Sequence, residues 1–239
     1  MTDHGDTACG KVTAMSTPAE AFSTAAIDQL GERLRRALTV EDLRLLDQYR
    51  RKFGADYAVV VAAVRDALAL DASGRPAKST TAIGEKLKRG SMRLSQMQDI
   101  AGCRIIVDDI LVQDAVVSRL ANMFQSTTMD RRDRPSHSYR AVQIIVRPKK
   151  RPIKIQVRTV LQHRWAELSE KAAHNFGIDI KYGGGHKTVR EVLDRASETV
   201  ASFERLEMKR EEAGDHVAML RNRFESNLLE FLAVVKEPK

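Results

Sequence analysis

The sequence predicts an α+β fold, in which a central mixed β-sheet of about five strands carries helices on its faces. Two strand signals and the helical segments around them support this prediction. Residues 103–107 form a short apolar run, and Ile153–Thr159 alternates apolar and polar residues with the period of a strand. In several longer segments, apolar residues recur at helical spacing.

The composition is that of a globular protein without a membrane anchor. The chain has 239 residues, of which 43% are hydrophobic and 30% are charged. No apolar run reaches the length of a membrane span, and the N-terminus lacks the apolar core of a signal peptide. The cysteines, Cys9 and Cys103, lie in unlike contexts, so we expect a reducing compartment, the cytoplasm, and no membrane partner.

The chain carries a formal net charge of +8. This balance suits an anionic partner such as a nucleotide or RNA, although many basic proteins have no such partner. Glycine-rich phosphate loops, metal-ligand spacing of histidines and Ser-His-Asp patterns are absent from the sequence. Those classes of site are therefore not predicted.

The N-terminal third predicts helices that follow a disordered tail at residues 1–20. Residues 21–38 have helical periodicity, and Thr39 with Asp42 forms a capping pair for the next helix. That next helix carries one apolar stripe from Leu45 to Leu68, which we interpret as core. Gly54 lies inside this stripe, at a cost of about 1 kcal/mol relative to alanine.

The middle of the chain supplies the predicted sheet. The elements expected in chain order are a loop at 71–76, a basic segment at 78–89 that is helical from Thr81, a strand at 103–107, a helix at 110–124, a polar loop at 125–138, a strand at 139–147, a hairpin loop at 148–152, a strand at 153–159, a helix at 160–176 and a glycine-rich turn at 181–185.

The C-terminal region predicts one long helix or a helical hairpin. Its apolar residues step by four and three, as in a coiled-coil seam, at Val189, Leu193, Ala196, Val200 and Phe203, and a second stripe follows at Val217, Leu220, Phe224 and Leu228. These helices either pack on the domain or pair with another subunit in a homo-oligomer. We therefore expect a tail at 1–20, a domain at 21–187 and a helical region at 188–239.

Two stretches predict opposite walls of a phosphate-handling cleft. Asp99 comes just before the apolar strand at 103–107. On the strand at 153–159, Lys154, Gln156 and Arg158 share one polar face. The basic segment at 78–89 is also predicted to line this cleft, because its lysine and arginine side chains suit a polyphosphate.

Five motifs in this order carry a family resemblance: KSTTAIGEKLKR, QMQDIAGCRIIV, PSHSYRAVQIIV, KIQVRT and LQHRWAELSEK. Together they resemble the synthetase domain of RelA/SpoT proteins, over about residues 40–185, and in particular the small alarmone synthetases. The resemblance implies transfer of pyrophosphate from ATP to the 3′-hydroxyl of GDP or GTP, with Mg²⁺ gathering the ATP phosphates.

The resemblance also implies roles for individual residues. Asp99 matches a magnesium ligand, and Tyr139 matches the aromatic residue that stacks on the acceptor guanine. The remaining matches are basic residues near the ATP phosphates, Lys78, Lys86 and Arg89, and polar residues of the same cleft, Arg104, Gln156 and Arg158.

The sequence departs from the family pattern at several positions. The pattern Gly-Tyr-Arg-x-x-His becomes Ser138, Tyr139, Arg140 and, at the last position, Gln143, and we expect Arg140 and Gln143 to contact nucleotide. The family's second magnesium ligand and base, a glutamate, is Lys154, which we count with the catalytic candidates. We expect Lys154 to face Asp99, where its ammonium group would fill the space of a metal.

Three functions follow from these observations. The first is a (p)ppGpp synthetase-type pyrophosphokinase, favoured by Asp99, Tyr139 and Arg158. The second is a catalytically impaired homologue that binds nucleotides or a protein and regulates, favoured by Lys154. The third is a relative that pyrophosphorylates tRNA, favoured by the net charge.

Overall fold

The computed structural model describes residues 22–36, 39–209 and 214–234. The predicted tail at residues 1–20 lies outside this part of the chain. The chain divides into two compact units: one ends at Tyr49 and takes in Ser79–Met97, and the other consists of Arg50–Lys78 and Gln98–Lys239. Within the described residues, no helix combines the length and apolar character needed to cross a bilayer.

The second unit is built on a five-stranded mixed sheet in the order β1-β2-β5-β4-β3, which confirms the predicted α+β class. β2 and β5 are parallel, and the other neighbouring pairs are antiparallel. The strands are β1 (Ser73–Arg75), β2 (Ala101–Val107), β3 (Ser126–Asp130), β4 (Val142–Val146) and β5 (Ile153–Thr159).

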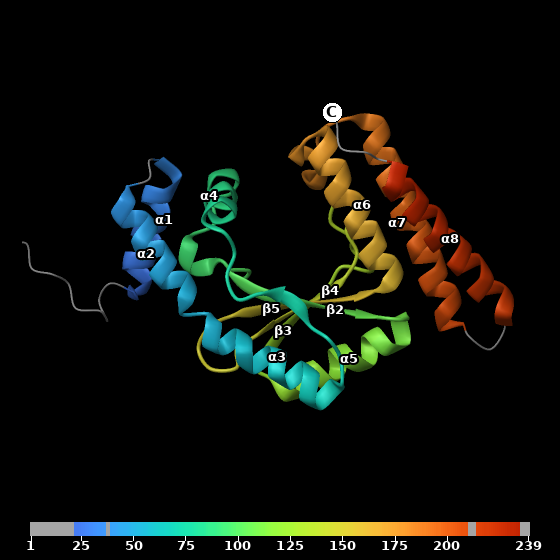
Figure 1. Ribbon diagram of the computed structural model, residues 1–239, viewed down its shortest axis with the longest axis horizontal. Coiled ribbons are helices and arrows are strands. Elements are labelled where there is room, and N and C mark those ends of the chain that lie inside the picture. The colour runs from blue at the N-terminus through green and yellow to red at the C-terminus, as the bar shows by residue number, and fades with distance from the viewer. Residues whose placement is uncertain (1–21, 37–38, 210–213, 235–239) are drawn as a thin grey trace, which may run out of the picture. The chain divides into compact units, whose positions relative to one another are not determined.

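One face of this sheet is apolar and covered by two helices, α3 (Gly54–Leu68) and α5 (Ile110–Met123) (Figure 1). Ile144 and Ile155 are register partners in the middle of the sheet, and both are fully buried. Burial of a side chain of this size contributes about 1.5–3 kcal/mol. Because successive side chains of a strand point to opposite faces, burial of the apolar face determines which side chains lie on the other face.

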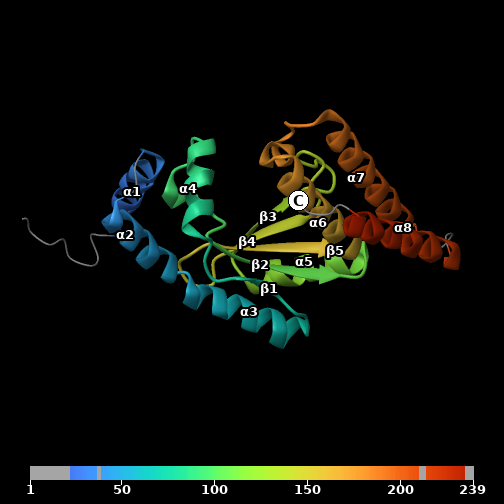
Figure 2. The ribbon, with the colours of Figure 1, turned by 45° about the horizontal axis from the view of Figure 1, so that its top comes forward.

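The C-terminal half of the second unit forms a helical layer on that opposite face, made of α6 (Val160–Phe176), α7 (Lys187–Met208) and α8 (Gly214–Val234) (Figures 1 and 2). α6 starts directly after β5, where Thr159 and Gln162 form a capping box. A short 3-10 helix, η3 (Ile178–Tyr182), connects α6 to α7.

The predicted C-terminal seam packs inside the chain. Leu193, Ala196 and Val200 are buried against Leu161, Trp165 and other residues of α6. Val189, Phe203 and Phe224 pack against the same cluster. Of the predicted alternatives, the region is a hairpin that packs on the domain, and self-association remains a prediction.

The first unit contains α1 (Thr24–Arg36), most of α2 (Val40–Arg51), α4 (Thr80–Arg89) and the 3-10 helix η2 (Leu94–Gln96). Arg35 joins α1 to the segment after α4 by donating to the carbonyl oxygens of Gly90 and Met92, at 2.6 Å each. The predicted capping pair is confirmed, because the Asp42 amide donates to Thr39 Oγ1 at 3.1 Å and Thr39 Oγ1 donates to Asp42 Oδ2 at 2.8 Å.

The single helix predicted through Leu45 and Leu68 is wrong. A turn at Lys52 and Phe53 interrupts the helix after α2, and α3 starts at Gly54. Phe53 is buried at the break, and the guanidinium carbon of Arg151 lies 5.4 Å from its ring centroid. The low helix propensity of Gly54 permits the break, and the apolar spacing continues through it, so periodicity alone did not reveal it.

Both edge strands were predicted as loops. β1 lies inside the predicted loop at 71–76, and β3 lies inside the predicted polar loop at 125–138. All residues of β1 are exposed, and none of β3 is fully buried, so neither shows the apolar alternation of a covered strand. The strand predicted at 139–147 is shorter, because β4 starts at Val142 and Tyr139 lies in the turn before it.

Candidate functional site

A polar row crosses the sheet on the face opposite α3 and α5. In the strand register, Gln156 of β5 has Arg104 of β2 on one side and Gln143 of β4 on the other. Residues directly opposite one another in neighbouring strands lie close enough for their side chains to interact. The structure therefore brings together three residues that the sequence predicted for one cleft.

Arg158 and Tyr139 lie next to this row. Arg158 Nη2 donates to Tyr139 Oη and to Gln156 Oε1, both at 3.1 Å. The guanidinium carbon of Arg158 lies 5.3 Å from the centroid of the Tyr139 ring, a distance typical of a cation–π contact. Trp165 of α6 also contacts this ring, with the centroids 6.2 Å apart and the planes tilted by 57°.

The positive charges at this end of the sheet are held away from water. Burial lowers the pKa of Arg104, and the nearby charge of Arg158 lowers it further. The Nε atoms of Arg104 and Arg158 are buried, and within the described residues neither has a hydrogen-bond partner. The charges of Glu167 and Glu170 oppose this lowering of the Arg104 pKa, and an anion bound beside the half-buried Arg104 and the buried Arg158 would oppose it further.

His163 of α6 adds to the same site. Arg104 Nη1 lies 3.4 Å from His163 Nδ1, which accepts the hydrogen bond in the neutral tautomer with the proton on Nε2. Burial lowers the pKa of His163; the carboxylate of Glu167 opposes this shift, and the charges of Arg104 and Arg158 reinforce it. Near neutral pH the imidazole is therefore uncharged and orients Arg104.

At the opposite end of β2, Asp99 forms an ion pair with Lys78, with Lys78 Nζ 3.0 Å from Asp99 Oδ2. The side chains are 14% and 23% exposed, so the pair is largely shielded from solvent. The Lys78 amide also donates to Ile100 O at 2.6 Å, which fixes the chain on which Lys78 lies. Sequence reasoning gave Lys78 and Asp99 separate roles, and the structure pairs them.

Lys154 lies half-buried on the polar face of β5, as predicted, with Gly102 as its register partner on β2. A Cβ atom at position 102 would lie only 2.5 Å from Lys154 O, so the close approach of the two strands requires glycine there. That Lys154 faces Asp99 remains a prediction.

The side chains at this end do not fit a magnesium site. Mg²⁺ is usually held by one or two carboxylates together with phosphate oxygens. Asp99 is the carboxylate that precedes β2, it is paired with Lys78, and Lys154 brings a second ammonium group to the neighbouring strand. Among the described residues, no group of three or more His, Cys, Asp or Glu side chains is placed to hold a metal ion.

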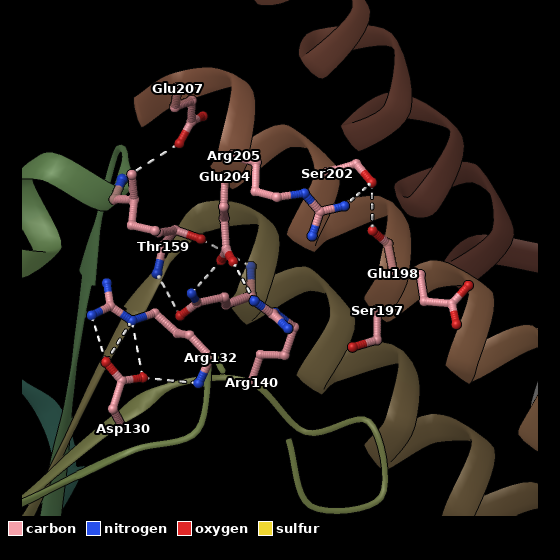
Figure 3. A network of polar contacts seen from close by, with 12 residues as sticks. Asp130, Arg132, Arg140, Thr159, Ser197, Glu198, Ser202, Glu204, Arg205 and Glu207 are labelled. Carbon is pink, nitrogen blue, oxygen red and sulfur yellow. Dashed lines mark hydrogen bonds and ion pairs between the residues drawn. The ribbon is translucent and has the colours of Figure 1, made fainter. Parts of the chain in front are cut away.

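Three other predicted residues lie elsewhere. Lys86 and Arg89 are on α4, in the first unit, so their role at this site remains a prediction. Arg140 is not part of the polar row; its Nη2 donates to Glu204 Oε2 of α7 at 2.9 Å (Figure 3). Its side chain is 13% exposed and that of Glu204 is 3% exposed, so this ion pair is buried.

The Arg140–Glu204 ion pair belongs to a buried polar network that sequence reasoning missed. Gln162 donates to Glu204, and Gln113 Nε2 donates to Gln162 Oε1 at 2.8 Å. Arg132 reaches the same network through Gln113 Oε1 at 3.2 Å. The network joins α5, α6 and α7 at the carboxyl end of β5. In the sequence, only the position of Glu204 next to the apolar seam of α7 could have indicated it.

Comparison with known proteins shows which family and fold the chain resembles. Residues 74–177 match the model for the region found in RelA/SpoT proteins. Uncharacterized proteins of Mycobacterium bovis and Mycobacterium tuberculosis are each 38% identical over 111 residues, which is 44% of this chain and 41% of theirs. The chain thus spans less than half the length of these curated relatives.

Solved structures with the same fold include small alarmone synthetases. Small alarmone synthetase 1 of Bacillus subtilis, bound to its product pppGpp, is 22% identical, with a TM-score of 0.55 over 74% of this chain and 100% of the other. A GTP pyrophosphokinase family protein of Streptococcus pneumoniae is 21% identical, with a TM-score of 0.54 over 80% of this chain and 98% of the other. Residues 74–177 are therefore similar to the RelA/SpoT region, within a chain that has the fold seen in a small alarmone synthetase.

Proposed function

We propose that the polar face of the sheet binds a guanosine polyphosphate without requiring a metal ion. Arg104 and Arg158 contact the phosphates, and Tyr139 contacts the base. The observation that carries this proposal is the geometry of Arg104, Arg158 and Tyr139: Arg104 is the register partner of Gln156, and Arg158 donates to Gln156 and lies over the Tyr139 ring. Phosphate oxygens would offset the charges of the two arginines, and guanidinium groups match phosphate geometry with paired hydrogen bonds.

Tyr139 supports the choice of a nucleotide over free phosphate. Its ring is held by Arg158 and by Trp165, and an aromatic ring fixed in this way suits stacking on a purine. The pppGpp bound to the Bacillus subtilis enzyme is our reason for naming guanosine polyphosphates as the ligand class. In this proposal the domain senses or sequesters such a nucleotide.

Pyrophosphate transfer from ATP to the 3′-hydroxyl of GDP or GTP is the second candidate. Asp99 favours it, because this carboxylate precedes β2 at the position of the family's first Mg²⁺ ligand. The Lys78–Asp99 ion pair and the lysine at position 154 weigh against it, since the first occupies the carboxylate that a metal ion would need and the second adds a charge that repels the metal ion. Binding alone is therefore our first proposal.

Equilibrium dialysis of the full chain with pppGpp, GDP, GTP and ATP, in EDTA and in Mg²⁺, tests the proposal. We expect pppGpp to bind in EDTA, with an affinity that Mg²⁺ changes little. A parallel incubation with radiolabelled ATP, Mg²⁺ and GDP or GTP, followed by separation of the products, tests the second candidate. Absence of pppGpp binding in EDTA would refute the first proposal, and rapid product formation would establish the second.

A further inference from the structure

The backbone just before β4 is held in an unfavourable conformation. His137 and Ser138 have φ angles of 50° and 66°, in the left-handed region that residues other than glycine rarely adopt. Tyr139 follows directly and donates from its amide to Ser136 O at 3.1 Å. Such strain persists only where the surrounding structure holds it, so the contacts of this turn decide where the Tyr139 ring lies.

Helix α7 holds Ser138 by both its side chain and its backbone. Ser138 Oγ donates to Asp194, and Ser197 Oγ donates to the carbonyl oxygen of Ser138 at 2.7 Å. Farther along α7, Glu204 accepts from Arg140 at 2.9 Å (Figure 3). The residues on each side of Tyr139 are therefore fixed to the same helix.

α7 is itself fixed to the residue that contacts the Tyr139 ring. Trp165 Nε1 donates to Leu193 O at 2.8 Å, next to Asp194. Trp165 is 3% exposed and contacts Tyr139 with its ring. The turn before Tyr139 and the Trp165 ring are thus both bound to α7, and both contact or adjoin Tyr139.

We infer that Asp194 and Ser197 are positioning residues that hold the Tyr139 ring for stacking on the base of the bound nucleotide. This inference rests on the proposed function and extends it to a helix beyond the matched RelA/SpoT region, which ends at residue 177. Glycine would adopt the left-handed conformation of Ser138 without strain, whereas serine does not. The Asp194 contact compensates for the serine.

The experiment uses four variants of the full chain: Asp194→Ala, Ser138→Gly, the double variant, and Glu198→Ala as a control that removes an exposed carboxylate of α7 one turn from Asp194. Equilibrium dialysis measures the Kd for pppGpp. Hydrogen exchange followed by mass spectrometry measures protection of peptides that cover residues 136–141 in the ligand-free protein.

We expect Asp194→Ala to weaken pppGpp binding about tenfold and to speed exchange in this turn, because a strained serine loses its support. Ser138→Gly should keep the Kd within about twofold, because glycine needs no such support. In the Ser138→Gly background, Asp194→Ala should then change neither readout, and Glu198→Ala should match the unmodified protein. Ser197→Ala is expected to act in the same direction as Asp194→Ala.

Equal effects of Asp194→Ala in the serine and glycine backgrounds would overturn the inference, because they would show that Asp194 acts through the fold in general. So would exchange rates in this turn that match those of Glu198→Ala. If the unmodified protein fails to bind pppGpp, the proposed function fails by itself. The exchange measurement then still decides whether α7 holds the turn.

Discussion

The two ends of the polar sheet face differ in how closely they follow the family pattern. At the carboxyl end of β5, Arg158, Tyr139 and the nearby Arg104 provide desolvated positive charge and an aromatic ring. At the amino end, Lys78 is paired with Asp99, and Lys154 adds a second lysine on β5. If the proposed function holds, nucleotide recognition and metal-dependent chemistry use separate residues, so the comparison predicts that mutations can alter one without the other.

The largest expected effect comes from the carboxyl end. Arg158→Ala should weaken pppGpp binding by about 2 kcal/mol, or about thirtyfold in Kd, because it removes hydrogen bonds from a charged group to phosphate and to Tyr139. Arg223→Ala, which removes an exposed arginine of α8, is the control in the same dialysis measurement. Equal Kd values for the two variants would remove the distinction between the two ends.

The next effect concerns the amino end. Two unit charges 4 Å apart interact by about 4 kcal/mol at an effective dielectric constant of 20, so an ammonium group can exclude a cation there. Lys154→Glu should therefore raise Mg²⁺-dependent pyrophosphate transfer from ATP to GDP or GTP at least about tenfold. Gln143→His should add to this gain, and Asp99→Asn should abolish it.

Lys149→Glu is the matched control for Lys154→Glu, because it makes the same charge reversal at an exposed position of the β4–β5 turn. The opposite result is also informative. If the unmodified protein already transfers pyrophosphate rapidly and Lys154→Glu slows it, then Lys154 takes part in the reaction, and the amino end is rearranged but functional.

The smallest expected effect is a pH dependence of stability at the carboxyl end. The pKa of His163 is lowered in the folded state, so the unfolded state binds more protons as the pH falls below the ordinary value of 6.5. The stability from the neutral imidazole is thus fully present above that pH and is lost below it. His163→Gln should reduce the decrease in Tm between pH 7.5 and pH 5.5 by roughly 1–3 °C in a thermal melt. An unchanged decrease would indicate that His163 titrates normally.

Much of the fold could be predicted from periodicity. α5, α6 and β5 bury one face or stripe, and their predicted bounds agree closely with the structure. The edge strands could not be predicted in this way, because the residues of β1 and β3 are largely exposed and show no apolar alternation. The break at Phe53 was missed since both helices beside it present apolar residues in the same phase.

The site was predictable where the strand register decides it. Alternation indicates the polar face of β5 that carries Gln156, whereas Arg104 was predicted through the family resemblance. The two stretches were predicted as opposite walls of a cleft, and in the structure they are paired neighbours in one sheet. The partners of Arg140 and Ser138 were not predictable, because Glu204 and Asp194 lie on α7, 64 and 56 residues farther along the chain. Only tertiary packing creates such contacts, and a helix-surface carboxylate looks the same in sequence whether it faces solvent or an arginine.

Trp165 gives this protein a built-in optical reporter. It is the single tryptophan of the chain, so its emission needs no correction for other indoles. Its ring contacts Tyr139 and its Nε1 donates to α7, so the environment of one fluorophore depends on both the proposed base-binding residue and the helix that supports it. A guanine stacked on Tyr139 is an efficient quencher within short range. Titration of the unlabelled full chain with pppGpp should therefore change the emission intensity of Trp165, and stopped-flow mixing would follow the arrival of the nucleotide in real time.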